Sequence, residues 1–237
     1  MTVIDKRFTT VKQTKTYLEI VDQIVTLIRK GSIVPGEKLP AERKLSRELG
    51  TGRQCLREAF SALEVMRLVE VKPGKGAFVR ADAPLNLNGQ AAALSEEDSP
   101  FELLEARKII EPRAAALAAK RIVAGEITEL DKLLRTMKAN RAAGVYSPDP
   151  GRQLHLVIAK ASRNIVLYQF LGWIMDRMGR SLWNNLKGKS LEIPGRFEKY
   201  HHDHVVMVQA LKSKDAKQAE RIMLKHLSEI EKDILNT

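Results

Sequence analysis

Residues 39–80, LPAERKLSRELGTGRQCLREAFSALEVMRLVEVKPGKGAFVR, decide how the N-terminal third of the chain folds. Leucines one helical turn apart predict a short helix over residues 41–49, which ends in the glycine-containing stretch 50–52. A second helix is predicted over residues 53–66, because three apolar side chains share one face: Leu56, Phe60 and Leu63. Two helices joined by a short glycine-containing turn are the signature of a helix-turn-helix.

Two β-prone runs follow, residues 68–72 and 77–79, and the Pro-Gly-Lys-Gly turn between them predicts a small β-hairpin wing. In the second helix, Arg53 and Arg57 lie one turn apart and are expected to project together from the face opposite the leucines. Guanidinium groups at the start of an exposed helix suit guanine edges and phosphate oxygens in a DNA major groove. Any single arginine also fits an ordinary solvated helix face, but the ordered set favours DNA binding.

The motifs LPAER, GTGRQCLREAF and LVEVKPGKGAFV resemble the N-terminal winged helix of GntR-type bacterial transcription regulators, over about residues 17–80. The chain departs from that family at Gly52, where the family usually has Ser or Thr. The hydroxyl of that residue would cap the helix, and its loss costs roughly 0.5–2 kcal/mol unless Thr51 substitutes. The resemblance implies a DNA-contacting set of eight residues: Arg43, Thr51, Gly52, Arg53, Gln54, Arg57, Gly74 and Lys75.

The composition supports a polyanionic partner. The net charge is +11 and the isoelectric point is near 9.8. Residues 1–80 carry 16 Lys and Arg against 9 Asp and Glu, a net charge of +7, whereas residues 81–237 carry 24 against 20, a net charge of +4. The positive charge is therefore concentrated where the helix-turn-helix is predicted, as DNA binding requires. Charge alone would fit RNA or anionic lipid equally well.

Several site classes are excluded by what the chain lacks. Cys55 is the single cysteine, so no disulfide and no cysteine-based zinc site can form within one chain. The first 15 residues are polar and basic, without the apolar stretch of a signal peptide. The most apolar run, residues 165–175, is too short to span a bilayer. We therefore expect a soluble, cytoplasmic protein with no membrane partner.

A change of composition divides the chain into two predicted domains. Residues 1–80 form the DNA-binding domain, which begins with a loose basic arm over residues 1–15, and residues 81–99 form a polar linker. The remaining residues, 100–237, are expected to form an all-α bundle for effector binding and dimerisation, so that the fold as a whole is mainly α. Six helices are predicted there: 101–123, 126–143, 149–162, 164–187, 195–212 and 215–235. The 164–187 helix is apolar over most of its circumference, which predicts a place in the middle of the bundle.

Three histidines, His155, His204 and His226, fall on three different predicted helices of the bundle. Neutral imidazoles that converge from facing helices suit Zn²⁺, Ni²⁺ or a similar ion. The spacing alone favours the alternative that each is a core or surface histidine with a satisfied hydrogen bond. His201 and His202 are interpreted as surface residues at a helix start.

Residues 100–235 resemble the FCD effector-binding domain of FadR-like GntR regulators, through Arg107-xxx-Glu111, LHLVIAKASRN and HxxxxxALxxxDxxxAxxxMxxHL. The resemblance implies a metal site of one Asp and three histidines, and the histidine positions are His155, His204 and His226. The Asp position is Gly151, and Asp149 would point elsewhere on a regular helix. The resemblance thus implies either a weakened metal site or a metal-free pocket whose histidines bind the effector.

The predicted function is a ligand-responsive, non-enzymatic transcription regulator that binds a palindromic operator as a homodimer. The resemblance implies repression. A small organic or sugar acid is the expected effector, bound by Arg107, His155, His204 and His226, with Arg177 or Arg180 as further candidates. Two alternatives are a metal-dependent hydrolase built on the three histidines and a nucleic-acid binder without an effector.

Overall fold

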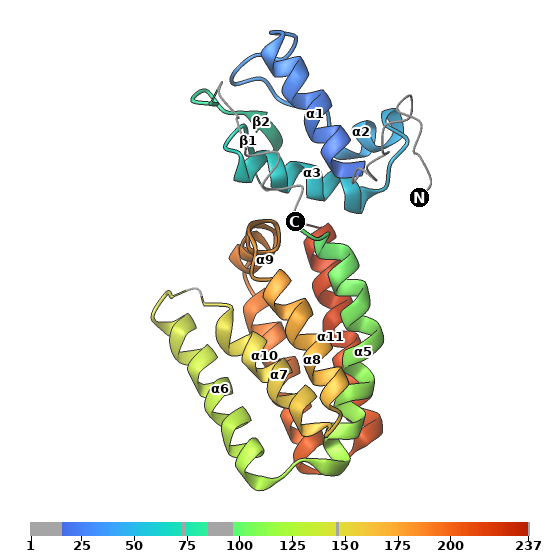
Figure 1. The fold of residues 1–237 in the computed structure, drawn as a ribbon. Coiled ribbons are helices and arrows are strands. Elements are labelled where there is room, and N and C mark those ends of the chain that lie inside the picture. Colours follow the sequence, from blue (N-terminus) through green and yellow to red (C-terminus); the bar gives the residue numbers. More distant parts are fainter. Residues whose placement is uncertain (1–15, 73, 85–96, 146, 237) are drawn as a thin grey trace, which may run out of the picture. The chain divides into compact units, whose positions relative to one another are not determined.

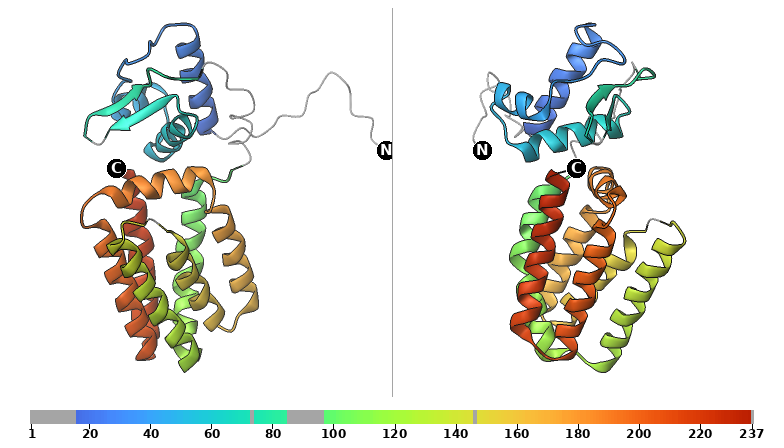
Figure 2. Two further views of the ribbon diagram at one scale, coloured as in Figure 1. Left: turned by 90° about the vertical axis from the view of Figure 1, so that its left-hand side faces the viewer. Right: turned by 180° about the vertical axis from the view of Figure 1, so that it is seen from behind.

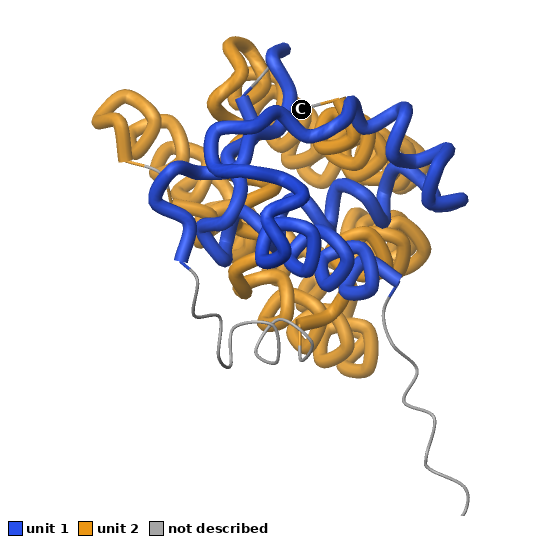
Figure 3. Tube along the Cα trace, turned by 90° about the horizontal axis from the view of Figure 1, so that it is seen from above, with its two compact units in different colours: residues 1–96 blue, residues 97–237 orange. Residues whose placement is uncertain are grey.

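The protein is described by a computed structural model that covers residues 16–72, 74–84, 97–145 and 147–236. The chain forms two compact units, residues 1–96 and 97–237 (Figure 3). The predicted basic arm over residues 1–15 and most of the predicted linker lie outside the described residues.

The first unit is the predicted winged helix-turn-helix (Figure 1). Its antiparallel hairpin pairs Val69 with Val79 and Lys72 with Gly76. An N-terminal helix packs on the second helix of the motif and buries Ile20 and Ile24 against an apolar face that includes Leu56 and Leu63. The elements are α1 (Thr16–Arg29), α2 (Glu42–Glu48), α3 (Arg53–Val65), β1 (Val69–Lys72) and β2 (Gly76–Val79).

The second unit is an all-α bundle, as predicted. Figures 1 and 2 show α5 and α11 side by side along their lengths, and α9 lying across one end of the bundle. Small alanines on α5, such as Ala115 and Ala118, are fully buried and allow this close packing. The helices in the described part of this unit are α5 (Pro100–Arg121), α6 (Ala124–Ala142), α7 (Asp149–Ala161), α8 (Ile165–Arg177), α9 (Ser181–Glu192), α10 (Arg196–Lys212) and α11 (Ala216–Leu235).

The prediction of a single helix over residues 164–187 is wrong, because the chain forms two helices there, α8 and α9. At the break, a Cβ on Gly179 would lie 3.1 Å from the Arg152 guanidinium and 3.2 Å from the Asp176 carbonyl oxygen, so a side chain there would be crowded. The new helix begins without a capping side chain of its own. Instead the carboxylate of Glu97 accepts hydrogen bonds from the Ser181 hydroxyl and the Leu182 backbone N–H, 2.9 Å for the latter.

The predicted central position of this apolar stretch is also wrong. One face of α8 is buried in the bundle through Leu171, Ile174 and Met175. The opposite face exposes four large apolar side chains: Ile165 (63%), Val166 (67%), Phe170 (45%) and Trp173 (46%). The apolarity around this helix therefore does not correspond to burial on all sides within the chain. No helix in the described ranges is long and apolar enough to cross a membrane.

Candidate functional site

The N-terminus of α3 presents its first residues to solvent. Gly52 is the N-cap in an extended conformation and has no side chain with which to cap the helix. Arg53 and Gln54 are exposed in the first turn, and Arg43 is exposed on α2. At the wing, both described candidates, Gly74 and Lys75, are exposed as well.

Arg57 differs from the expectation that it projects outward beside Arg53. Its guanidinium Nη1 lies 3.0 Å from the Glu42 carboxylate on α2, and its side chain is only 13% exposed. The second arginine of the predicted pair thus joins the two helices of the helix-turn-helix. Sequence spacing places Arg57 on the same face as Arg53 but does not reveal an ion pair to a preceding helix.

The three predicted histidines converge in the core of the second unit. His155 comes from α7, His204 from α10 and His226 from α11, and all three side chains are buried. One nitrogen of each lies within 4.8 Å of the others. The Nε2 atoms of His155 and His204 are 3.4 Å apart.

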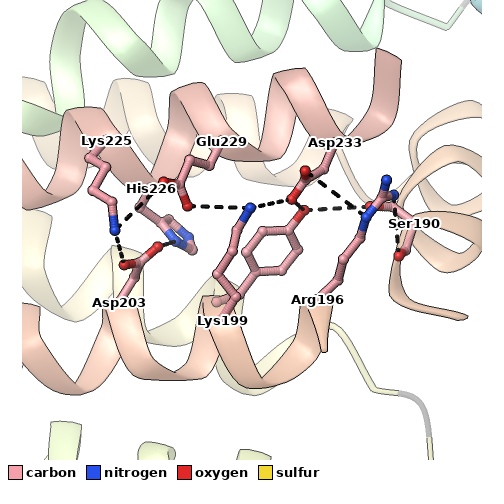
Figure 4. Close-up of polar contacts among 9 residues, drawn as sticks. Ser190, Arg196, Lys199, Asp203, Lys225, His226, Glu229 and Asp233 are labelled. Atoms are coloured by element: carbon pink, nitrogen blue, oxygen red, sulfur yellow. Dashed lines mark hydrogen bonds and ion pairs between the residues drawn. The ribbon is translucent and has the colours of Figure 1, made fainter. Parts of the chain in front are cut away.

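Two of the histidines are backed by buried carboxylates that sequence analysis did not assign to the site. Glu111 on α5 accepts a hydrogen bond from His155 Nδ1 and another from Arg107. Asp203 on α10 lies 3.5 Å from His226 Nδ1 and 2.9 Å from Lys225 Nζ (Figure 4). A carboxylate behind an imidazole fixes the orientation and tautomer of the ring.

The electrostatics keep the histidine cluster neutral. Burial lowers the pKa of His155 and His204, and it lowers the pKa of His226 to about 4 against the opposing Asp203 carboxylate. Burial alone would raise the pKa of Glu111, but Arg107 and His155 outweigh it and lower that pKa to about 2. The site therefore combines the ionised carboxylate of Glu111 with neutral imidazoles, whose nitrogen lone pairs are available to a ligand.

This donor set fits a zinc-like ion. Two nitrogens bound to one tetrahedral Zn²⁺ at about 2.0–2.1 Å are roughly 3.3–3.4 Å apart, close to the observed His155–His204 separation. The Nδ1 atom of His204 is buried without a hydrogen-bond partner among the described residues. The fourth position has no side chain, because Gly151 occupies it, and a Cβ there would meet no atom within 4 Å. Asp149 is exposed at the start of α7 and does not join the cluster.

A cavity of about 210 Å³ opens beside the histidines. Its apolar wall includes Met178, Trp183 and Tyr200, and in the described chain no acidic side chain lines it. Four cationic side chains line it: Arg107, Arg141, Arg152 and Lys187. Burial, an electropositive lining and an apolar wall together suit a small anionic ligand.

Some cavity residues differ from the sequence-based expectation. Arg177 and Arg180 do not line the cavity, and Arg177 instead pairs with Asp98 at 2.9 Å. His201, interpreted as a surface residue, lines it. Arg152 could have been found from its place beside Gly151, whereas Lys187 was hidden by the single long helix predicted over α8 and α9.

A row of polar contacts leads from the cluster along α10 and α11 (Figure 4). Asp233 near the end of α11 accepts hydrogen bonds from Lys199 Nζ at 2.7 Å and from Tyr200 Oη at 2.8 Å. Arg196 donates to the Ser190 hydroxyl at 3.0 Å and so joins α10 to the end of α9. Tyr200 belongs both to this row and to the cavity wall.

Comparisons with known proteins agree with both units. Residues 16–79 match the model of bacterial regulatory proteins of the gntR family, and residues 102–229 match the FCD domain. The Uxu operon regulator of Haemophilus influenzae is 31% identical over 91% of this chain and 80% of that protein. The HTH-type transcriptional regulator LutR of Bacillus subtilis is 30% identical over 89% of this chain and 96% of that protein.

The solved structure of Streptococcus agalactiae GntR aligns with 91% of this chain and 99% of its own, at 25% identity and a TM-score of 0.48. The families matched are those of transcription regulators and not of enzymes. With a gntR-type helix-turn-helix in the first unit and an FCD domain in the second, the chain belongs to the FCD-containing GntR family of DNA-binding bacterial transcription regulators.

Proposed function

We propose that this regulator responds to a small carboxylic or sugar acid bound at His155, His204 and His226. The convergence of three neutral, buried imidazoles in an electropositive cavity supports this proposal most strongly. Arg107 lines the same cavity and can pair with a carboxylate, while Glu111 holds its guanidinium in place.

A metal ion is the second part of the proposal. Zn²⁺ or Ni²⁺ would be held by the three histidines and would supply a Lewis-acidic centre for a carboxylate ligand. Glu111 and Asp203 orient His155 and His226, and the space beside Gly151 leaves room for the ligand or for water. Because the family aspartate is missing, the affinity for the metal is expected to be weaker than in relatives that have it.

On DNA, the exposed start of α3 would lie in the major groove, with Arg53 and Gln54 toward base edges. Arg57 would act beside them from its ion pair with Glu42. The other candidates would contact the backbone or an adjacent groove: Arg43, Thr51, Gly52, Gly74 and Lys75.

A homodimer on a palindromic operator completes the proposal. Two-fold dimers bind two half-sites, so the operator symmetry follows from the protein symmetry. The exposed face of α8, with Phe170 stacked on Trp173 at 5.8 Å between ring centroids, supplies an apolar surface for a second copy. Ile109 on α5, which packs against α8, is also 70% exposed. In this proposal the acid repacks the bundle and releases DNA. The resemblance to the family implies that the DNA-bound form represses transcription.

A thermal-shift screen of small carboxylic and sugar acids, with and without chelator, tests the ligand site. At a ligand concentration 100 times Kd, binding stabilises the folded chain by about 2.7 kcal/mol. We expect at least one acid to raise the melting temperature of the wild type and to lose this effect in His204→Ala. An acid that stabilises both proteins equally would place the ligand elsewhere. Chelator should reduce the shift if a metal takes part.

Restoring a carboxylate at position 151 is expected to strengthen metal binding. The space beside Gly151 can accept a side chain without a clash. We expect Gly151→Asp to lower the Kd for Zn²⁺ by roughly 10-fold or more, by analogy with the effect of supporting carboxylates at metal sites. Titration of Zn²⁺ against a competing chelator measures the change. The matched control is Gly151→Ala, which shares the loss of glycine flexibility but adds no ligand; equal Kd values for the two variants would contradict the geometry proposed.

A further inference from the structure

Lys187 places a buried amino group at the cavity, and burial lowers its pKa well below the ordinary value although the Asp233 carboxylate opposes the shift. The residue lies on α9, and its Nζ atom is inaccessible to solvent and has no hydrogen-bond partner among the described residues. Its Nζ atom lies over the face of the Tyr200 ring, 3.7 Å from the ring centroid. Burial of a charge without a paired anion costs several kcal/mol, so such a group usually serves a ligand or is absent.

The other cations of the cavity wall differ from Lys187 because each has a carboxylate partner. Arg107 pairs with Glu111, Arg152 lies 3.5 Å from Asp176, and Arg141 lies 3.5 Å from Glu198. The carboxylate near Lys187, Asp233, already accepts from Lys199 and Tyr200. Lys187 is therefore the cavity cation with unused capacity for an anion, within the part of the chain that the structure describes.

The lining offers cationic groups at more than one point, and of these Lys187 has no carboxylate hydrogen-bonded to it. It contains four cationic side chains and, among the described residues, no acidic one. Its volume of about 210 Å³ exceeds several times the roughly 30 Å³ that a water molecule occupies in the liquid, so there is room for a carbon chain between two polar ends. The apolar wall of Met178 and Trp183 suits such a chain.

We propose that the ligand is a small dicarboxylic acid, and that Lys187 binds the carboxylate that the histidine cluster and Arg107 do not take. This inference rests on the proposed function, because it assumes that the first carboxylate lies at the histidines. It adds a specificity-determining residue on α9. Because α9 lies across the end of the bundle, a ligand that spans the two points also joins α9 to the helices that carry the histidines (Figure 2).

Isothermal titration calorimetry with matched acids tests the assignment. Butyrate is compared with succinate, and valerate with glutarate, on the full chain with and without added Zn²⁺. We expect the diacid of at least one pair to bind the wild type roughly 10- to 100-fold more tightly than its monoacid partner. Lys187→Met should abolish this preference and leave the affinity for the monoacid unchanged. Lys189→Met, which removes the same charge from the same helix outside the cavity lining, should behave as the wild type.

Folding of the variant is checked by its melting temperature without ligand. Because Lys187→Met replaces a buried amino group that has no hydrogen-bond partner by an apolar chain of similar length, its stability should equal or exceed that of the wild type. Equal binding of monoacid and diacid to the wild type, or a diacid preference that persists in Lys187→Met, overturns the role of Lys187. Monoacid binding that depends on His204 would then still support the proposed function. If no acid in the panel binds, the dicarboxylic-acid proposal fails, while the thermal-shift screen with His204→Ala tests the proposed function separately.

Discussion

Glu111→Ala is expected to lower the free energy of unfolding of the bundle by about 3–5 kcal/mol, the usual effect of removing one partner from a buried ion pair. Glu111 is 1% exposed and accepts hydrogen bonds from both Arg107 and His155. Without its carboxylate, the buried guanidinium of Arg107 has no anion and the His155 ring loses the acceptor that orients it. Chemical denaturation followed by circular dichroism measures the loss.

The matched control is Glu220→Ala, which removes a carboxylate from the surface pair with Arg113. That pair is 3.1 Å long, but its side chains are 33% and 76% exposed, so its loss should cost no more than about 1 kcal/mol. Similar losses for the two variants would mean that the Arg107–Glu111–His155 group is not the buried network described here. Glu111→Gln, which keeps an acceptor of the same size, should lie between the two.

Arg53→Ala together with Arg57→Ala is expected to remove discrimination between cognate and random DNA. Each bidentate arginine–guanine contact contributes about 1–3 kcal/mol of discrimination. Losing both should cost roughly 10²- to 10⁴-fold in the ratio of affinities, provided that Arg57 exchanges Glu42 for a base edge when DNA binds. The cognate duplex is obtained by selection from a random pool. Fluorescence anisotropy at fixed salt then compares the two duplexes, because backbone contacts alone leave salt-dependent, non-specific binding.

Single variants separate the roles of the two arginines. Arg53 is exposed and should affect DNA binding with little change in stability. Arg57 is paired with Glu42, so Arg57→Ala should also weaken the packing of α2 on α3, and Glu42→Ala should reproduce that part without removing a guanidinium. A double variant that discriminates between the duplexes as well as the wild type does would disprove DNA recognition by α3.

The helix-turn-helix and the convergence of the three histidines could both be predicted from the sequence, and for the same reason. Both depend on residues whose spacing is set by helix periodicity, such as Leu56, Phe60 and Leu63 on one face of α3, and on motifs with defined positions. The carboxylates that contact the histidines could not be predicted, because contacts between helices far apart in sequence leave no local sequence pattern. Asp203 reaches His226 across 23 residues, and Glu111 reaches His155 across 44 residues.

The break of residues 164–187 into two helices shows a different limit of prediction from sequence. Hydrophobic periodicity continues through the break, and only Gly179 interrupts it. The helix start at Ser181 depends on Glu97, which lies far upstream and gives no signal near the break. The error moved Lys187 onto the wrong helix and hid its place in the cavity. The same periodicity gave no indication that α8 leaves Phe170 and Trp173 exposed, because apolarity alone does not distinguish a buried helix face from an exposed apolar one.

Anisotropy of a labelled cognate duplex, titrated with an acid that stabilises the protein, tests most directly whether the histidine cluster controls DNA binding. Typical coupling between two sites changes affinity by about 5- to 150-fold. We expect the acid to weaken DNA binding by the wild type within this range and to have no effect on His204→Ala, which should bind the duplex as the wild type does without ligand. Unchanged DNA affinity of the wild type at saturating acid would contradict the proposed regulation.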